Sequence, residues 1–115
     1  MLETRLISPF AVKPTHHLIA AKYFSLEHSG HVNEILNTPI VLFGESFYVY
    51  DGHHRIMLAR VRKTDNSAYI ITSAADFNEL QREYWDPELN PERCSYEEVL
   101  GILQRASLAD DEVFN

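Results

Sequence analysis

Hydrophobic and polar positions along the chain predict short strands that alternate with helices. Four apolar runs rich in β-branched and aromatic residues are typical of strands, at 5–8, 40–43, 46–50 and 68–72. Between and after these runs, apolar residues recur at spacings of three and four, which is the period of one helix face. The pattern therefore predicts an α+β fold, with a small mixed β-sheet and helices packed around it.

The first helix is expected to begin just after Pro14. Thr15 is an acceptable N-cap, and Gly30 is a suitable stop. Between them, Ile19, Tyr23 and Leu26 follow at spacings of four and three, so this stripe is expected to face the core. The next segment, 31–37, is expected to form a helical turn.

Later helix boundaries are marked by capping boxes, in which a serine precedes an acidic residue by three positions. Ser73 with Asp76 opens one predicted helix, and Ser95 with Glu98 opens another. The proline-containing stretch 85–92 between them predicts an ordered surface loop that includes Trp85.

Composition bounds the class of protein. A chain of 115 residues fits a single domain, 1–115, and 45% hydrophobic residues are enough for one core. The formal charge of −7 argues against a general nucleic-acid binder, because phosphate contacts need clustered positive charge. The acidic residues at 110–112 are interpreted as a solvated tail. No apolar run suits a membrane span or a secretion signal, and the single cysteine forms no internal disulfide. A cytoplasmic location is expected.

The most informative stretch is the junction where the strand near 46–50 ends at Asp51. Gly52 can adopt a positive φ without steric cost, and a helix running to about 63 follows with His53, His54 and Arg55 in its first turn. Free backbone N–H groups make a cation unfavourable there, unless an anion binds. Alternatively, Arg55 pairs with Asp51 or another carboxylate and staples the turn. The spacing alone leaves both interpretations open.

A strand, the sequence Asp-Gly-His-His-Arg at 51–55 and an apolar helix resemble the ParB/sulfiredoxin superfamily. Its members carry variants of this motif at a phosphate-binding turn. The segment 38–42 and the hairpin after it resemble the part that the family places just before the motif. The resemblance covers residues 5–73 and leaves 74–115 as a helical C-terminal extension. It implies that Gly52, His53, His54 and Arg55 contact nucleotide phosphates.

Two departures restrict the activity that the resemblance implies. Sulfiredoxins have a cysteine at the position of His53, and Cys94 lies far from the motif, which argues against sulfinic acid reductase activity. Free serine kinases of the superfamily have a catalytic glutamate after a Lys-Pro-like segment. Here Lys13-Pro14-Thr15 is followed by His16 and His17, which are candidate general bases because imidazole titrates near neutral pH. They are equally well explained as exposed residues at a helix start.

The resemblance implies a nucleotide-phosphate-binding domain that acts as a nucleotide hydrolase or a small-molecule phosphotransferase. Asp51, His54 and Arg55 would be catalytic, with Arg55 and His54 neutralising phosphate charge. Asp51 would orient a metal or a nucleophile. The cofactor would be Mg²⁺ carried by a nucleotide such as ATP, ADP or CTP. No metal bound by the protein alone is expected, because adjacent histidines point apart.

Two alternatives belong to other functional classes. One is a non-catalytic regulatory or protein-interaction module of the same fold, which binds a protein partner or a second copy of the chain. The other is a ParB-like DNA-associated protein or nuclease. The acidic charge argues against the second alternative, and ParB partition proteins also continue into a helix-turn-helix region for which this chain is too short.

Overall fold

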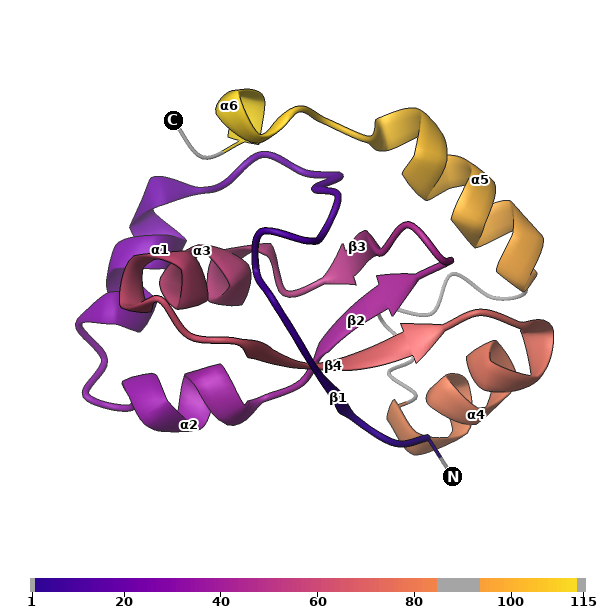
Figure 1. Cartoon of the computed structure of the whole chain (residues 1–115), viewed down its shortest axis with the longest axis horizontal. Helices are drawn as coiled ribbons and strands as arrows, with labels where there is room; N and C mark the ends of the chain where they lie inside the picture. Colours follow the sequence, from indigo (N-terminus) through magenta and orange to yellow (C-terminus); the bar gives the residue numbers. More distant parts are fainter. Residues whose placement is uncertain (1, 85–93, 114–115) are drawn as a thin grey trace.

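The computed structural model describes residues 2–84 and 94–113, so the predicted loop around Trp85 lies outside the described residues. Within the described part, four strands form one mixed sheet in the order β1-β4-β2-β3 (Figure 1). The strands are β1 (Arg5–Ile7), β2 (Ile40–Phe43), β3 (Tyr48–Asp51) and β4 (Asn66–Ile71). β2 and β4 are parallel, whereas the β1–β4 and β2–β3 pairs are antiparallel. The prediction of an α+β fold with a small mixed sheet is confirmed.

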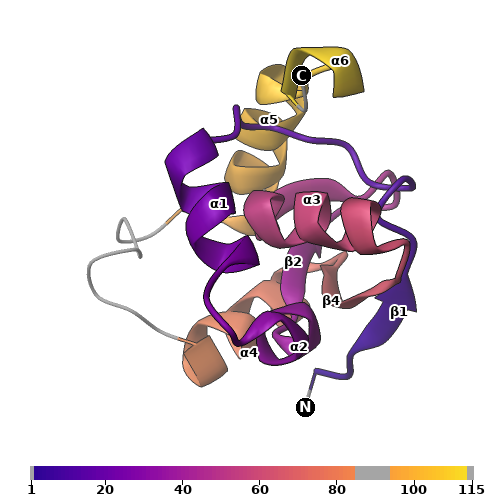
Figure 2. The same ribbon diagram turned by 90° about the vertical axis from the view of Figure 1, so that its left-hand side faces the viewer.

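Helices cover both faces of this sheet (Figures 1 and 2). The helices are α1 (Ala20–Glu27), α2 (Val32–Asn37), α3 (His53–Arg62), α4 (Ala74–Tyr84), α5 (Tyr96–Ala106) and α6 (Asp110–Val113). α3 connects β3 to β4, and α1 and α2 pack beside it. α4 and α5 lie on the other face, so the sheet separates the predicted motif from these two helices.

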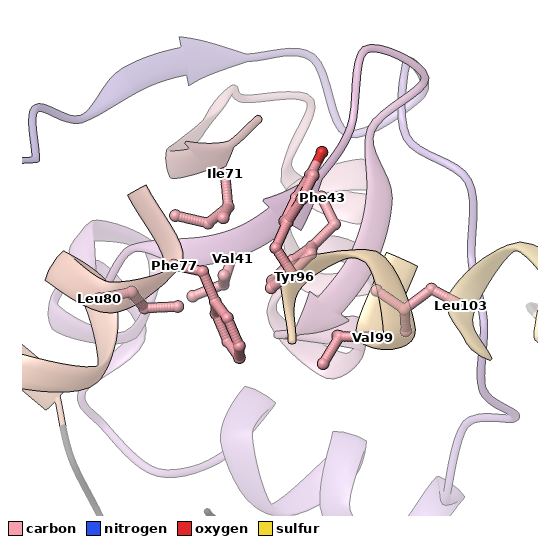
Figure 3. Close-up of a cluster of buried hydrophobic side chains, with 8 residues drawn as sticks. All are labelled: Val41, Phe43, Ile71, Phe77, Leu80, Tyr96, Val99 and Leu103. Atoms are coloured by element: carbon pink, nitrogen blue, oxygen red, sulfur yellow. The ribbon is translucent and has the colours of Figure 1, made fainter. Parts of the chain in front are cut away.

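Each face of the sheet has its own apolar cluster. Figure 3 shows the cluster beneath α4 and α5, in which Phe43 lies with its ring centroid 5.5 Å from that of Phe77 and 5.7 Å from that of Tyr96. In the cluster on the other face of the sheet, Ile56 of α3 packs with residues of all four strands. Its buried members are Ile7, Val12, Ile40, Leu42, Val49, Ile56 and Ala68. α3 is therefore fixed by its buried side, which leaves its N terminus at the edge of the sheet.

The predicted start of the first helix is wrong. α1 begins at Ala20, and the preceding segment instead runs beside β3 in extended form. Lys13 N–H donates to the carbonyl of Phe47, and the Thr15 hydroxyl donates to the carbonyl of Val49. These bonds cover the free edge of β3, which would otherwise expose unpaired backbone groups. Thr15 is thus a partner of an edge strand and not an N-cap.

The predicted core stripe of this helix is also wrong. None of the eight residues of α1, all of them described, is fully buried. Tyr23 and Leu26 are half-buried, and Ile19, which precedes the helix, is 44% exposed. α1 is therefore a surface helix that rests on α3.

Two further boundaries differ from the prediction. β3 begins at Tyr48, because Phe47 has a φ of 59° and belongs to the turn. The predicted solvated tail contains the helical turn α6, in which Asp110 accepts a hydrogen bond from the Arg60 guanidinium over 3.2 Å. A long-range ion pair, invisible in local composition, therefore ties the C-terminal segment to α3.

The capping boxes are confirmed to different extents. The Ser95 hydroxyl accepts from Glu98 N–H and donates to the Glu98 carboxylate, so Ser95 caps α5 as predicted. Ser73 accepts from Asp76 N–H, but the Asp76 carboxylate bonds to the backbone N–H and hydroxyl of Thr72 instead.

Gly52 allows the chain to pass from β3 to α3 against the sheet. It is the N-cap of α3 with a φ of 112°, a conformation that side chains disfavour. A Cβ atom at this position would lie 2.5 Å from Cγ2 of Ile40, which is fully buried. The start of α3 therefore needs a residue without a side chain.

We predict that Gly52→Ala lowers the free energy of unfolding by about 3 kcal/mol or more, because backbone strain adds to overpacking. Gly30→Ala is the matched control, since Gly30 has a φ of 79° but open space around its Cβ position. The control should cost only about 1 kcal/mol. Urea unfolding of both variants measures the difference, and equal losses would contradict the packing argument.

Candidate functional site

A surface hollow of about 440 Å³ lies where α1 and α2 face the β3–α3 junction. Most of the residues expected from the sequence meet here. Its lining consists of His16, Lys22, Ser25, Leu26, Ile35, Thr38, Tyr50, Asp51, Gly52, His53, His54 and Arg55. The structure thus brings the whole 51–55 motif to one concave surface, together with His16 and residues of α1 and α2.

The first turn of α3 opens at this hollow. No side chain among the described residues caps the helix, whose N-cap is Gly52. The N–H groups of His53, His54 and Arg55 precede the first intrahelical donor, Ile56, which bonds to the carbonyl of Gly52. Free donors and the positive end of the helix dipole favour an anion at such a position.

Arg55 is held in place by two acceptors. Its Nη2 donates to Oδ2 of Asp51 over 3.1 Å and to the carbonyl of Pro39 over 3.2 Å. The interpretation of Arg55 as a staple for the turn is therefore realised in the structure. Its Nε is buried with no hydrogen-bond partner among the described residues, and 21% of the side chain remains exposed. The guanidinium is thus fixed at the wall of the hollow.

His53 accepts a backbone hydrogen bond. Thr15 N–H donates to its Nε2 over 2.9 Å, so the ring proton of the neutral imidazole resides on Nδ1. Burial, together with the neighbouring His16 and His54, lowers the pKa of His53 to about 4, against a smaller opposing effect of Asp51. His53 is therefore a neutral imidazole at pH 7.

His54 makes the equivalent bond four residues further along the N-terminal segment. Ile19 N–H donates to its Nε2 over 2.9 Å, which again requires a lone pair on that nitrogen. Burial lowers the pKa of His54, and the nearby positive charge of Lys22 lowers it as well. Both motif histidines thus face the hollow as neutral side chains whose Nε2 atoms are already bonded.

The two candidate general bases are separated by the structure. His16 lines the hollow, and its ring centroid lies 5.9 Å from that of His53. Its Nδ1 donates to the carbonyl of His17, which leaves the lone pair of the neutral ring on Nε2. His17 instead points to the C-terminal segment, where its Nδ1 donates to the carbonyl of Glu112. Only the first of the two lies among the lining residues.

Sequence reasoning missed four polar lining residues. Lys22 and Ser25 come from α1, Thr38 ends α2, and Tyr50 lies in β3. Lys22 and Ser25 are three positions apart and therefore share a helix face, a spacing that is visible in the sequence. Tyr50 packs against Phe43 with ring centroids 5.0 Å apart, and burial raises its pKa. The sequence contains no local signal for Thr38 or Tyr50.

Two general properties were also determined for the described residues. Among them, no three or more His, Cys, Asp or Glu side chains are grouped so that they could hold a metal ion. None of the helices in the described ranges is long and apolar enough to cross a membrane.

Comparison with known proteins gives no match to a family model, to a curated protein or to a solved structure. Any function must therefore be inferred from the geometry of the hollow and from the motif at 51–55.

Because His53 is half-buried and has a lowered pKa, the free energy of unfolding should depend on pH in the acid range. Its folded pKa of about 4 lies below the ordinary value of 6.5, so the unfolded chain takes up the proton first as pH falls. The stabilising contribution is fully present above pH 6.5 and is lost as pH falls to 4, by up to about 3 kcal/mol.

Urea unfolding at a series of pH values measures this slope. His53→Gln keeps an acceptor near the Nε2 position but does not titrate, so it should flatten the profile between pH 4 and 6.5. His31→Gln, at an exposed histidine beside Glu34, is the control and should retain the slope of the parent. A parent profile without this slope would contradict the assignment of a buried neutral His53.

Proposed function

We propose that the hollow at the β3–α3 junction binds the phosphate groups of a nucleotide, and that the chain is a phosphate-binding domain of the ParB/sulfiredoxin type. The observation that carries this proposal is that three features suited to an anion meet at one surface. The uncapped first turn of α3, the Arg55 guanidinium and Lys22 of α1 all border one concave surface.

The local charge supports an anionic ligand although the chain as a whole is acidic. The formal net charge is −7, yet the described lining contains Lys22 and Arg55 against a single carboxylate, Asp51. That carboxylate is already paired with Arg55. Together with the helix dipole, this arrangement leaves excess positive potential where the free N–H groups lie.

The protonation of the histidines refines the roles that the resemblance implies. With Nε2 bonded to backbone N–H, each neutral ring carries its proton on Nδ1 and acts there as a hydrogen-bond donor. His53 and His54 would therefore orient phosphate oxygens without adding charge. Gly52 would let the backbone donors approach, while Arg55 and Lys22 would supply the positive charge.

Catalysis would be hydrolysis of a nucleotide or phosphoryl transfer to a small molecule. Mg²⁺ would enter with the nucleotide and supply charge neutralisation, and Asp51 is the carboxylate that the hollow offers to it. Asp51 also holds the Arg55 guanidinium and so positions it. His16 would serve as the general base, a role supported by its position in the lining and by the lone pair on Nε2 of the neutral ring.

A non-catalytic module is the second candidate function. It is favoured by one observation, namely that the motif side chains already bond to the protein itself. His53 and His54 accept from backbone, and Arg55 donates to Asp51 and Pro39. A partner protein or a second copy of the chain would then be the ligand, with no turnover.

Calorimetric titration of ATP, ADP, CTP and GTP, each with Mg²⁺, tests the proposed function. The parent should bind at least one of them, and Lys22→Ala should weaken that binding about tenfold through loss of one charged contact. Lys22 is exposed, so this change should not disturb folding. Arg82→Ala, on α4 across the sheet, is the matched control and should bind like the parent.

Arg55→Ala should abolish binding, but it also removes the bond to Pro39, so circular dichroism must show that the variant is folded. A turnover assay with the bound nucleotide then separates the enzyme from the non-catalytic module. If the folded parent binds none of the four nucleotides, the proposed function is overturned.

A further inference from the structure

We propose that His53 and His54 form an acid-sensitive clasp, which holds the segment 15–19 against α3 and thereby positions Lys22 over the hollow. The clasp itself is a property of the apo protein. Its consequence for ligand binding rests on the function proposed above.

The clasp consists of two parallel contacts between α3 and the N-terminal segment. Nε2 of His53 accepts from Thr15 N–H and Nε2 of His54 accepts from Ile19 N–H, each over 2.9 Å. The donors are four residues apart in the chain, whereas the acceptors are neighbours. The two imidazoles therefore fix both ends of the short segment that leads into α1.

The second contact lies directly at the start of α1. Ile19 is the N-cap of that helix, with extended backbone at a φ of −105°. Lys22 and Ser25, both lining residues, follow within its first two turns. Since α1 has no fully buried residue among its eight described positions, its placement depends strongly on how its N-terminal end is tied. His54 is therefore a positioning residue for Lys22.

Protonation reverses this interaction. A neutral Nε2 accepts a hydrogen bond from the backbone N–H. A protonated Nε2 carries its own hydrogen, so two donors face each other and the bond is lost. The ring also becomes a cation in a region that already contains positive charge. The titratable or charged groups around the pair are His16 before α1, Lys22 on α1, Asp51 at the end of β3 and Arg55 on α3. Only Asp51 would favour the protonated form, and it is paired with Arg55.

Burial keeps the pKa of both histidines below the ordinary 6.5, so the clasp is closed at neutral pH. Acidification should release Ile19 and Thr15 from α3 and let the N-terminal end of α1 move away from the hollow. The expected result is a loss of the Lys22 contact with a bound phosphate as pH falls.

Hydrogen exchange followed by NMR tests the clasp directly on the full chain without ligand. The readout is the protection factor of the Ile19 amide, which corrects for the intrinsic pH dependence of exchange. In the parent it should fall at least tenfold as pH decreases from neutral into the acid range. His54→Gln should keep the amide protected throughout, because its carboxamide oxygen accepts near the Nε2 position and does not titrate.

His54→Ala should leave the Ile19 amide unprotected at every pH, and His31→Gln should behave like the parent. If the glutamine variant loses protection together with the alanine variant, or if the parent keeps the same protection from neutral pH into the acid range, the clasp is overturned. Because the glutamine variant conserves size and hydrogen bonding, a purely structural role of His54 would not predict its altered pH profile.

A second experiment measures how the affinity for inorganic triphosphate, used as the probe, depends on pH. Parent affinity should fall more steeply with acid than that of His54→Gln, with His31→Gln again matching the parent. If the parent does not bind triphosphate at neutral pH, only the proposed function is contradicted. The exchange experiment tests the clasp without any ligand. Equal pH profiles for the parent and the glutamine variant would refute the link between clasp and site.

Discussion

The close contact between Gly52 and Ile40 is the constraint on which the rest of the structure depends. Without a Cβ at position 52, the chain can leave β3 and begin α3 directly against the first residue of β2. α3 then buries Ile56, Leu58 and Ala59 and closes one face of the sheet. The same contact leaves the first N–H groups of α3 facing outward. Core packing and the candidate anion site therefore arise from one backbone geometry.

The sequence predicted the parts of the fold that local pattern determines. The four strands, the turn at Gly52 and the helix cap at Ser95 depend on neighbours in the chain, and the structure contains all of them. The start of α1 could not be predicted in this way. Thr15 has the local features of an N-cap, but its backbone N–H bonds to His53, which is 38 positions away. A tertiary hydrogen bond overrides a local propensity there.

The candidate site shows the same division. The motif at 51–55 was found from a turn residue and a group of charges, whereas Thr38 and Tyr50 enter the hollow only because α2 and β3 converge on it. The role of Arg55 could not be predicted from the sequence, because its bond to the Pro39 carbonyl, formed together with the bond to Asp51, depends on the tertiary structure. From the sequence alone, His16 and His17 are equally good candidates for the general base. Their separation depends on the C-terminal segment, whose Glu112 carbonyl accepts from His17.

The central claim is that the first turn of α3 and the facing side of α1 together receive phosphate. The most direct measurement is an NMR titration of backbone amides with inorganic triphosphate at neutral pH. If phosphate binds there, the largest shifts should occur at His53, His54 and Arg55, with a second group around Lys22 on α1. Saturable shifts that leave these amides unaffected and occur elsewhere would contradict it, as would the absence of any saturable shift.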